Sequence, residues 1–440
     1  MVKPLVAVVG RPNVGKSTFF NKMVGKRLSI VEDRPGVTRD RVYADAEWCG
    51  YSFTLIDTGG IEIHSEDQMW SHIRRQVELA VDIADVILYF VDGKTGIMPD
   101  DYDVADYLRM SKKPIVLAVN KIDNSSSYGV YDFYDLGLGE PIPISAENSL
   151  NLGDLLDEIV AHFPERTEFE EDGEALKIAV VGKPNAGKSS LVNRLLGTER
   201  VIVSNIAGTT RDAIDTPFSV DGKNYRIIDT AGIRKKSKVE EDVEYYSVIR
   251  SIDAMRRADV VLVMIDAEEG LTEQDVKICG LVHESRKPSL IVMNKWDLVP
   301  KDTFTINKFN EKLDAELKFM SYYKAVYISA LTGQRTKTLL GEVNKVYENA
   351  SRRISTGLLN DVLQDAMSVN EPPTHNGKKL KVYYATQASS NPPTFVLFVN
   401  DETIMHFSYK RYLENALRKA FDFSGTPISL KVRNKDSEDI

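Results

Sequence analysis

The sequence predicts an α/β protein with two tandem domains, each built on a doubly wound, mostly parallel sheet, followed by a small α+β domain. Three observations predict this fold class. Apolar strand-like runs alternate with helical patterns up to about residue 350, which indicates parallel strands joined by right-handed crossovers. A nine-residue stretch with two glycines follows an apolar run twice, at residues 10–18 and 182–190. The rest of the chain carries no third copy of that stretch.

The first domain is predicted over residues 1–163. Its first strand, 6–9, is apolar and β-branched, which is typical of a strand buried on both faces. The helix after the glycine-rich stretch is expected to end at about residue 24, and the polar residues 30–40 predict a loop. Further strands are expected at 51–56, 86–91, 114–119 and 142–144, and further helices at about 69–83, 100–110 and 152–162.

The second domain, residues 176–351, repeats the motifs of the first in the same order. An acidic segment without periodicity, 164–175, is predicted to link the two domains. A whole domain is therefore duplicated, and the third domain, 352–435, is of another kind. It is expected to contain helices at 356–369 and 408–420 and strands at 379–385, 394–399 and 427–432, before a flexible acidic tail at 436–440.

Composition excludes several classes of protein. The chain has 440 residues, more than one hydrophobic core holds, and a net charge of −9. The acidic balance disfavours a general nucleic-acid binder, so no DNA partner is expected and any RNA contact must use a local basic face. Only two cysteines are present, which disfavours a disulfide or zinc framework. The N-terminus leaves no room for a signal peptide, and no apolar run approaches the ~20 residues that span a bilayer. We expect a cytoplasmic protein without a membrane span.

The glycine-rich stretch fits the phosphate-loop pattern G-x-x-x-x-G-K-[ST] in its required context of strand, turn and helix. Its glycines let successive backbone N–H groups point at phosphate oxygens, and the helix N-terminus adds partial positive charge. Lys16 and Lys188 are expected to reach the β- and γ-phosphates. The predicted phosphate-binding residues are Gly10, Arg11, Pro12, Asn13, Val14, Gly15, Lys16, Ser17 and Thr18, and in the second copy Gly182, Lys183, Pro184, Asn185, Ala186, Gly187, Lys188, Ser189 and Ser190.

A carboxylate and two hydroxyls in each copy predict a Mg²⁺ site. Each carboxylate ends a strand, where open α/β sheets bind ligands, and is expected to hold the ion through water. The predicted Mg²⁺ ligands are Ser17, Thr38 and Asp57, and in the second copy Ser189, Thr210 and Asp229. The turns after the carboxylates are also predicted to contact nucleotide, with backbone N–H groups of Gly60 and Gly232 on the γ-phosphate: Asp57, Thr58, Gly59, Gly60, Ile61, Asp229, Thr230, Ala231, Gly232 and Ile233.

A later motif in each copy, Asn-Lys-x-Asp at the end of a strand, predicts that the base is guanine. A carboxylate accepts hydrogen bonds from both the ring N–H and the exocyclic amine of guanine, whereas adenine leaves it unpaired. The lysine is expected to cover the base, the asparagine to tie this loop to the phosphate loop, and a Ser-Ala pair further on to offer a backbone N–H to guanine's oxygen. The residues are Asn120, Lys121, Ile122, Asp123, Ser145, Ala146, Asn294, Lys295, Trp296, Asp297, Ser329 and Ala330.

Neither copy has a side chain at the expected position that could orient the attacking water. The position after the turn, where some GTPases carry a glutamine, is Ile61 or Ile233, whose side chain forms no hydrogen bond. Hydrolysis is therefore expected to be slow without help from the backbone, another side chain, a cation or a partner. The predicted catalytic set is Lys16, Thr38, Asp57, Gly60, Lys188, Thr210, Asp229 and Gly232.

These paired loops and motifs, together with the C-terminal α+β module, resemble the EngA/Der family of bacterial GTPases over nearly the whole chain. The resemblance implies GTP hydrolysis, a KH-like third domain and a role in assembly of the large (50S) ribosomal subunit, with that subunit or its precursor as partner and a monomeric chain. Asn13 and Asn185 are similar to the phosphate-loop asparagine that helps related GTPases bind K⁺, and turn stabilisation is the other interpretation. An alternative function is a nucleotide-dependent scaffold on the ribosome in which only one site turns over.

Two further features of the sequence bear on the binding partner and are each compatible with more than one contact. Residues 233–238 are strongly basic, unlike their counterpart in the first copy, and we expect a nucleotide-gated contact with RNA phosphates or the third domain. The third domain lacks a GxxG loop, so docking against a GTPase domain is as well supported as RNA contact. Its strand aromatics are expected in the core: Tyr383, Tyr384, Phe395 and Phe398.

Overall fold

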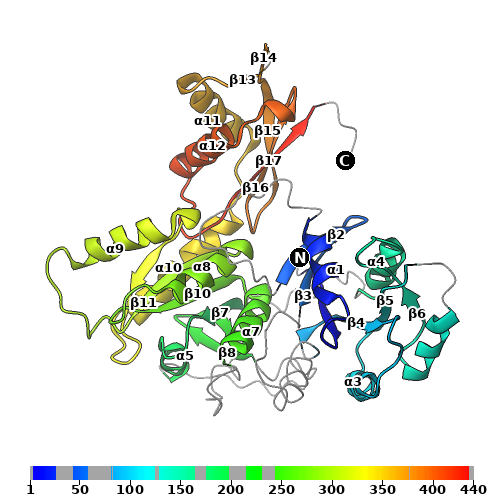
Figure 1. The fold of residues 1–440 in the computed structure, drawn as a ribbon. Coiled ribbons are helices and arrows are strands. Elements are labelled where there is room, and N and C mark those ends of the chain that lie inside the picture. The colour runs from blue at the N-terminus through cyan, green and yellow to red at the C-terminus, as the bar shows by residue number, and fades with distance from the viewer. Residues whose placement is uncertain are drawn as a thin grey trace. The chain divides into compact units, whose positions relative to one another are not determined.

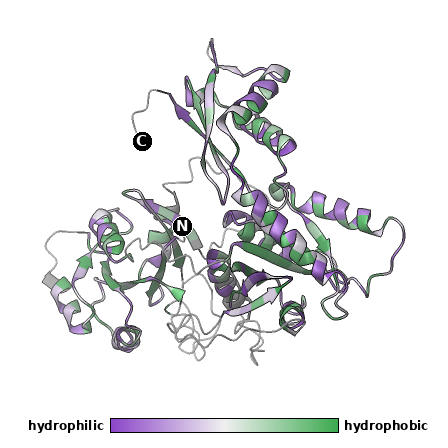
Figure 2. Ribbon diagram, turned by 180° about the vertical axis from the view of Figure 1, so that it is seen from behind, coloured by the Kyte–Doolittle hydropathy of each residue, from purple (hydrophilic) through white to green (hydrophobic). Residues whose placement is uncertain are grey.

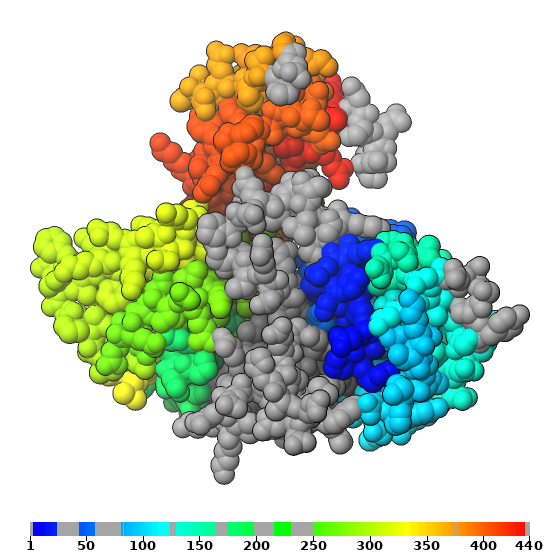
Figure 3. Space-filling model, viewed as in Figure 1, coloured from blue at the N-terminus to red at the C-terminus, as the bar shows by residue number. Residues whose placement is uncertain are grey.

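The computed structural model describes residues 3–25, 43–57, 81, 83–123, 128–163, 175–197, 215–229, 243–375 and 377–435, and the others are grey in Figures 1 and 3. The chain divides into two compact units, Met1–Asp172 and Gly173–Ile440. The finer division into two domains, linker, third domain and tail remains a prediction. Among the helices that are described, none is long and apolar enough to cross a membrane.

The first unit contains a six-stranded sheet in the order β2-β3-β1-β4-β5-β6 (Figure 1). All neighbours pair in parallel except β2 and β3, which form an antiparallel hairpin. Strand β2 was not predicted, although its alternating Ala44 and Ala46 are buried and its turn places Cys49 and Gly50 at positive φ. The strands are β1 Leu5–Gly10, β2 Tyr43–Trp48, β3 Tyr51–Asp57, β4 Val86–Asp92, β5 Ile115–Asn120 and β6 Pro141–Pro143.

Helices cover both faces of this sheet because alternate strand residues point to opposite faces. Val6 and Val8 of β1 belong to one apolar cluster, which also contains side chains of α1 and α4. Ala7 and Val9 belong to a second cluster with side chains of α3 and the 3₁₀ segment η3. The helices predicted after the phosphate loop and at 100–110 and 152–162 agree with these elements to within a residue or so, whereas η3 was not foreseen. The helix predicted at about 69–83 lies almost wholly outside the described residues. The bounds are α1 Lys16–Gly25, α3 Pro99–Met110, η3 Tyr128–Leu136 and α4 Leu152–Ala161.

The second unit repeats this topology, with the order β12-β11-β10-β7-β9-β8 and one antiparallel pair, β8 with β9. Its strands are hydrophobic at the sheet centre, as Figure 2 shows in green. The strands are β7 Leu176–Val181, β8 Thr216–Val220, β9 Lys223–Ile227, β10 Val260–Asp266, β11 Ser289–Asn294 and β12 Ala325–Tyr327. The helices are α5 Lys188–Gly197, α7 Val243–Arg257, α8 Glu273–Glu284, α9 Thr305–Glu316, η5 Lys318–Met320 and α10 Thr336–Ser351. Two sheets of the same strand order confirm the duplicated α/β fold.

The end of the second unit is the expected α+β module. Helices α11 and α12 pack side by side on one face of a three-stranded sheet, β15-β16-β17, in which β16 pairs in parallel with β17 (Figure 1). The predicted strand 379–385 is misplaced, because β15 begins at Val382 and a separate short hairpin precedes it. The bounds are α11 Thr356–Val369, β13 Thr374–His375, β14 Lys378–Lys379, β15 Val382–Ser389, β16 Thr394–Val399, η6 Glu402–Ile404, α12 Phe407–Ala420 and β17 Ser429–Asn434.

This module docks on the second α/β sheet through the turn after α12. The N–H of Gly425 donates to Tyr322 O at 2.6 Å, and Gly425 O accepts from the N–H of Ser289 at 2.7 Å. Thr426 Oγ1 donates to Val346 O at 3.2 Å. The half-buried guanidinium of Arg418 lies 4.9 Å from the centre of the Tyr322 ring, which adds a cation–π contact. Within this unit the module therefore contacts the second α/β sheet, which is one of the two alternatives that the sequence left open.

Candidate nucleotide-binding sites

Each phosphate loop connects the carboxyl end of a central strand to the first turn of a helix. Gly15 lies in this loop at φ 98°, and a Cβ there would stand 2.1 Å from Asn120 Nδ2. Gly187 has the same surroundings, with φ 94° and Asn294 Nδ2 at 2.1 Å. A side chain is thus excluded at these two glycines both by the left-handed backbone and by the approach of the base loop.

The loop lysines fold back onto their own loops. Lys16 Nζ donates to Gly10 O at 2.7 Å and to Arg11 O at 2.6 Å. Lys188 Nζ makes the same bonds, to Gly182 O at 2.5 Å and Lys183 O at 2.7 Å. Burial lowers the pKa of Lys16 to about 8, although the Asp57 carboxylate acts in the opposite direction. Burial also lowers the pKa of Lys188 to about 8. A phosphate group bound in each loop would offer the lysine ammonium of that loop a charged acceptor, which forms a stronger hydrogen bond than a backbone carbonyl.

Two of the three Mg²⁺ ligands predicted for the first copy meet in the structure. Ser17 Oγ donates to Asp57 Oδ2 at 3.1 Å, where a hard cation would find a hydroxyl and a carboxylate side by side. In the second copy Asp229 follows β9 at φ 55°, and its N–H donates to Asp215 Oδ1 at 3.0 Å. The remaining residues predicted near the γ-phosphate lie outside the described residues: Thr38, Thr58, Gly59, Gly60, Ile61, Thr210, Thr230, Ala231, Gly232 and Ile233.

The buried asparagine of each base loop ties that loop to the phosphate loop, as predicted. Asn120 Nδ2 donates to Val14 O at 2.7 Å, and Asn294 Nδ2 donates to Ala186 O at 2.9 Å. Both asparagines are 2 % exposed. Because the amide spans the two loops in each copy, the position of the base is fixed relative to that of the phosphates.

The Ser-Ala pairs are held by hydrogen bonds within the protein, and their predicted contact with guanine stays a prediction. Asn120 Oδ1 accepts from the N–H of Ala146 at 2.8 Å, and Ser145 N–H donates to Leu150 O at 3.1 Å. The second copy has the same arrangement, with Ala330 N–H on Asn294 Oδ1 at 2.9 Å. These N–H groups therefore hold the loop together in this structure, and a bond to guanine's oxygen would require one of them to change partner.

The lysines of the base motif are held by carboxylates at the end of the neighbouring strand. Lys121 Nζ donates to Asp92 Oδ2 at 2.6 Å, and Lys295 contacts Asp266 in the same way. Burial opposes ionisation of Asp92, but hydrogen bonds from Lys121 and backbone N–H groups hold its pKa below the usual range. Neither carboxylate was predicted, although each is the last residue of a buried strand at matching positions in the two copies. They orient the lysine stems that are predicted to cover the base.

A further pair that sequence reasoning missed joins each phosphate loop to the next helix. Arg11 Nε donates to Asp101 Oδ1 at 2.7 Å, and Asp101 is fully buried in the first turn of α3. In the second copy Lys183 Nζ lies 3.5 Å from Asp275 Oδ2 in the first turn of α8. The cation after the first loop glycine thus contacts a buried carboxylate in both copies, which fixes the tip of the loop.

The open face of the C-terminal sheet carries aromatic and basic side chains, and the prediction of buried tyrosines is wrong. Phe395 is buried against the helices, but Tyr383 is 48 % exposed and Tyr384 is 41 % exposed. A register shift between Val382 and Tyr384 puts one extra residue into β15, so both tyrosines face outward. Tyr384 stacks on Phe398 with ring centres 4.5 Å apart. Exposed cations of β17 and the residue after it follow the same face: Lys431, Arg433 and Lys435.

The fold and these sites define a tandem P-loop GTPase with a C-terminal α+β module. Comparison with known proteins agrees with that class. A family described as "50S ribosome-binding GTPase" matches residues 5–121 and 177–295, and one described as "KH-domain-like of EngA bacterial GTPase enzymes, C-terminal" matches residues 353–433.

Full-length relatives define the family. The chain is 56 % identical over 434 residues to GTPase Der of Clostridium perfringens, covering 98 % of this chain and 99 % of the relative. It is 55 % identical to GTPase Der of Alkaliphilus oremlandii over the full length of both. A solved structure of Era in complex with MgGDPNP and nucleotides 1506–1542 of 16S ribosomal RNA is 24 % identical, with TM-score 0.32, covering 59 % of this chain and 93 % of that one. The chain belongs to the EngA/Der family and is a GTP-hydrolysing enzyme.

Proposed function

We propose that this GTPase is a two-site molecular switch that acts in assembly of the large (50S) ribosomal subunit. The proposal rests on one observation above the others: in both copies a buried asparagine joins the predicted guanine loop to the phosphate loop. Two such sites in one chain would allow two separate nucleotide-dependent changes of state. The family description "50S ribosome-binding GTPase" supports the ribosomal particle as partner, and the cytoplasm as the place of action.

In each site we assign the phosphates to the glycine-rich loop and its lysine, and the base to the Asn-Lys-x-Asp loop. Asp123 and Asp297 would accept the two N–H donors of guanine. Ser17 with Asp57, and Ser189 with Asp229, would hold Mg²⁺, completed by Thr38 and Thr210. The N–H groups of Gly60 and Gly232 would meet the γ-phosphate.

Nucleotide specificity tests the assignment of the base. Asp123→Asn and Asp297→Asn should each shift one site from GDP to XDP, because the amide offers a donor where xanthine has an oxygen. We would measure the stoichiometry of both nucleotides by calorimetry. Two GDP sites persisting in either variant would refute the assignment.

Nucleotide-dependent binding to ribosomal particles tests the switch. Co-sedimentation of the chain with purified large subunits should differ between GTP, GDP and a non-hydrolysable GTP analogue. Equal binding with all three nucleotides would refute the switch function, but not the GTPase activity. The basic residues 233–238 lie outside the described residues, and replacing Arg234, Lys235 and Lys236 by Ala tests their proposed contact with RNA through the same assay.

We further propose that K⁺ assists hydrolysis at both sites. Asn13 and Asn185 occupy equivalent positions with φ 63°, a left-handed conformation that asparagine tolerates. That conformation accounts for an asparagine as a turn residue as well, so the geometry alone favours neither role. Turnover that is faster in KCl than in NaCl at equal ionic strength would support the cation, and equal rates would exclude it.

The scaffold function remains a second candidate, because the nucleotide-binding motifs are intact in both copies and therefore do not separate the two functions. Lys16→Ala and Lys188→Ala each disable one phosphate loop in the full chain. If both sites turn over, each variant retains part of the GTPase rate. If one variant retains the full rate and the other none, only one site hydrolyses GTP and the other serves binding alone.

We propose that the open face of the C-terminal sheet contacts single-stranded ribosomal RNA. Stacked Tyr384 and Phe398 offer a flat aromatic surface, and Lys431, Arg433 and Lys435 line its edge. Lys435 Nζ lies 4.9 Å from the centre of the Tyr383 ring. Stacking platforms bordered by cations bind unpaired bases without a GxxG loop, and each stacked base contributes about 1–3 kcal/mol.

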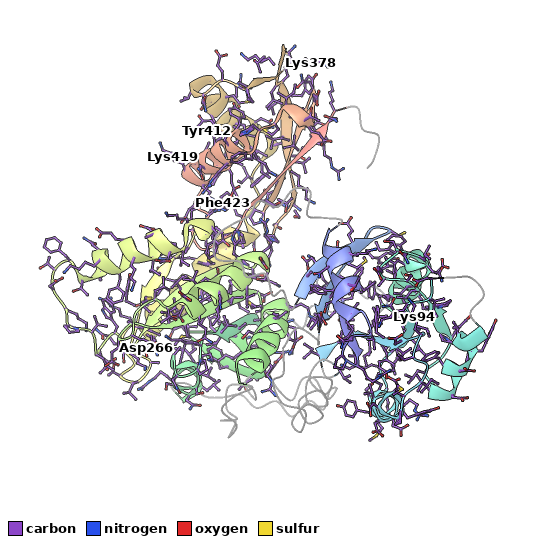
Figure 4. The ribbon with its side chains drawn as sticks, in the orientation of Figure 1. Lys94, Asp266, Lys378, Tyr412, Lys419 and Phe423 are labelled. Atoms are coloured by element: carbon purple, nitrogen blue, oxygen red, sulfur yellow. The ribbon has the colours of Figure 1, made fainter. Side chains whose placement is uncertain are left out.

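The test compares two faces of the same module. Tyr384→Ala should weaken binding of a fluorescent single-stranded oligoribonucleotide about five-fold or more. Lys419→Ala is the matched control and should change oligoribonucleotide binding little. Lys419 is exposed on α12, away from this sheet face (Figure 4). Equal loss in both variants would mean that binding is not specific to this face, and no loss in either would exclude this face.

A further inference from the structure

The base-reading carboxylate of the first site already has three partners. Lys94 Nζ donates to Asp123 Oδ2 at 2.7 Å. Asp123 Oδ1 accepts from Ser145 Oγ at 2.8 Å and from Asn148 Nδ2 at 3.0 Å. These hydrogen bonds, that from Lys94 foremost, hold the pKa of Asp123 below its usual range. The carboxylate that is assigned to guanine is thus already engaged in this structure by three donors from the protein.

The second copy has different residues at two of those three positions. Lys94 and Glu268 stand at equivalent points of one turn, because the N–H of each donates to the strand-end carboxylate, Asp92 Oδ1 at 2.9 Å or Asp266 Oδ1 at 3.0 Å. Figure 4 labels Lys94, in the turn after β4, and Asp266, at the end of β10. A lysine in the first copy therefore corresponds to a glutamate in the second, and glutamate cannot donate to a carboxylate.

The loop after the Ser-Ala pair differs as well. The N–H of Asn148 donates to Ser145 Oγ at 3.2 Å, and the N–H of Thr332 donates to Ser329 Oγ at 3.1 Å, so these two residues are equivalent. Asn148 reaches Asp123 with its amide, whereas threonine has a shorter side chain with a single hydroxyl. Of the three residues that donate to Asp123, only the serine has the same residue type in the second copy, as Ser329.

A carboxylate offers about four lone-pair sites. Three protein donors and the two N–H donors of guanine make five, so at least one protein donor must leave when the base enters. Lys94 is the donor that leaves most readily, because its side chain is 62 % exposed and the ammonium can return to water. Its departure also uncovers the negative charge that the base then meets.

We propose that Lys94 lowers the affinity of the first site for guanine nucleotides by holding Asp123 in the empty pocket, so that the first site binds more weakly than the second. This inference rests on the proposed role of Asp123 in reading guanine. Lys94 is a positioning residue: it acts through the carboxylate and is absent from the second copy. An exposed ion pair of this kind changes an equilibrium by a factor of about five at most, and salt screens it.

The experiment reads one site at a time in the full chain. In an Asp297→Asn background the second site prefers xanthine, so a fluorescent GDP analogue reports on the first site. Lys94→Met keeps the length of the side chain and removes its donor. It should tighten GDP binding about two- to five-fold at low ionic strength, and the gain should shrink in high salt.

Two further variants complete the test. Glu268→Lys in an Asp123→Asn background places the ammonium in the second pocket and should weaken GDP binding there by a similar factor. Lys112→Met is the control for net charge, since Lys112 is exposed near the amino end of β5, away from the base loop at its other end. Lys112→Met should leave affinity unchanged.

Unchanged or weaker GDP binding in Lys94→Met would overturn the proposal, and weaker binding would make Lys94 a contact for the nucleotide itself. A gain of the same size in Lys112→Met would also overturn it, because net charge alone would then explain the effect. The XDP preference of Asp123→Asn is a separate readout. If that preference fails to appear, the assignment of Asp123 fails, whereas a normal preference with no effect of Lys94→Met refutes only the present inference.

Discussion

The phosphate-loop lysines should take up protons when nucleotide binds. In the free chain burial lowers the pKa of Lys16 and of Lys188 to about 8 from an ordinary value of 10.5. A bound diphosphate is a strong anion next to each ammonium and raises that pKa again. At pH 8 each lysine is therefore about half protonated before binding and nearly fully protonated after it.

The expected uptake at pH 8 is about half a proton for each site, or about one for a chain that binds two GDP molecules. The sign follows from linkage. Above pH 8 the complex holds more protons than the free chain, so affinity falls as pH rises. Between pH 7 and pH 8.5 the loss should be about four-fold for each site. Below pH 7 both states are fully protonated and the lysines contribute no pH dependence.

Calorimetric titration of GDP at pH 8, in buffers with different ionisation enthalpies, measures the uptake directly. The nucleotide phosphates are ionised well below this pH and contribute little. Lys16→Arg is the informative control, because a guanidinium stays charged throughout, and it should remove about half of the uptake. Zero uptake at pH 8, or an affinity that rises from pH 7 to pH 8.5, would refute the reasoning.

Three other outcomes can be checked with single variants or reagents. Gly425→Ala should lower the melting temperature of the second unit by several degrees, because a Cβ there would stand 2.6 Å from Val346 Cγ2 at φ 70°; an unchanged melting curve would contradict the docking contact. Asn294→Ala should cost about 2 kcal/mol or more of stability in denaturant titration, since it leaves Ala186 O and Ala330 N–H unpaired in a buried place; a loss below about 0.5 kcal/mol would mean that water replaces the amide. A thiol reagent should modify exposed Cys49 in the native chain and buried Cys279 only after unfolding, as burial also raises the pKa of Cys279; rapid reaction of both thiols would argue against this core.

Much of the fold followed from the sequence because hydrophobic period and motif spacing are local signals. Strands such as 394–399 and the helix 356–369 have the predicted bounds. The tether from Asn120 to the phosphate loop also followed, since the motif specifies both of its ends. By contrast, β2 was missed although its alternation was visible, because its polar residues and the tight turn after it hide a short edge strand.

The remaining surprises depend on contacts that no local pattern encodes. The outward direction of Tyr383 and Tyr384 depends on one extra residue in the ladder with β16, which is a property of pairing rather than of β15 alone. Lys94 belongs to no motif and reaches Asp123 across 29 positions of sequence. The signal that could have revealed it was a comparison of the two copies, lysine in one and glutamate in the other.

The surface on which the C-terminal module docks shows that the two duplicated halves have diverged. It uses Ser289, Tyr322 and Val346, all from the second copy. Helix α10 has 16 residues where its counterpart α4 has 10, and Val346 lies in the added turns. The duplicated halves have therefore ceased to be interchangeable. A gene with its halves transposed would encode two α/β domains but would place beside the module a first copy whose helix α4 lacks the added turns that carry Val346 in α10.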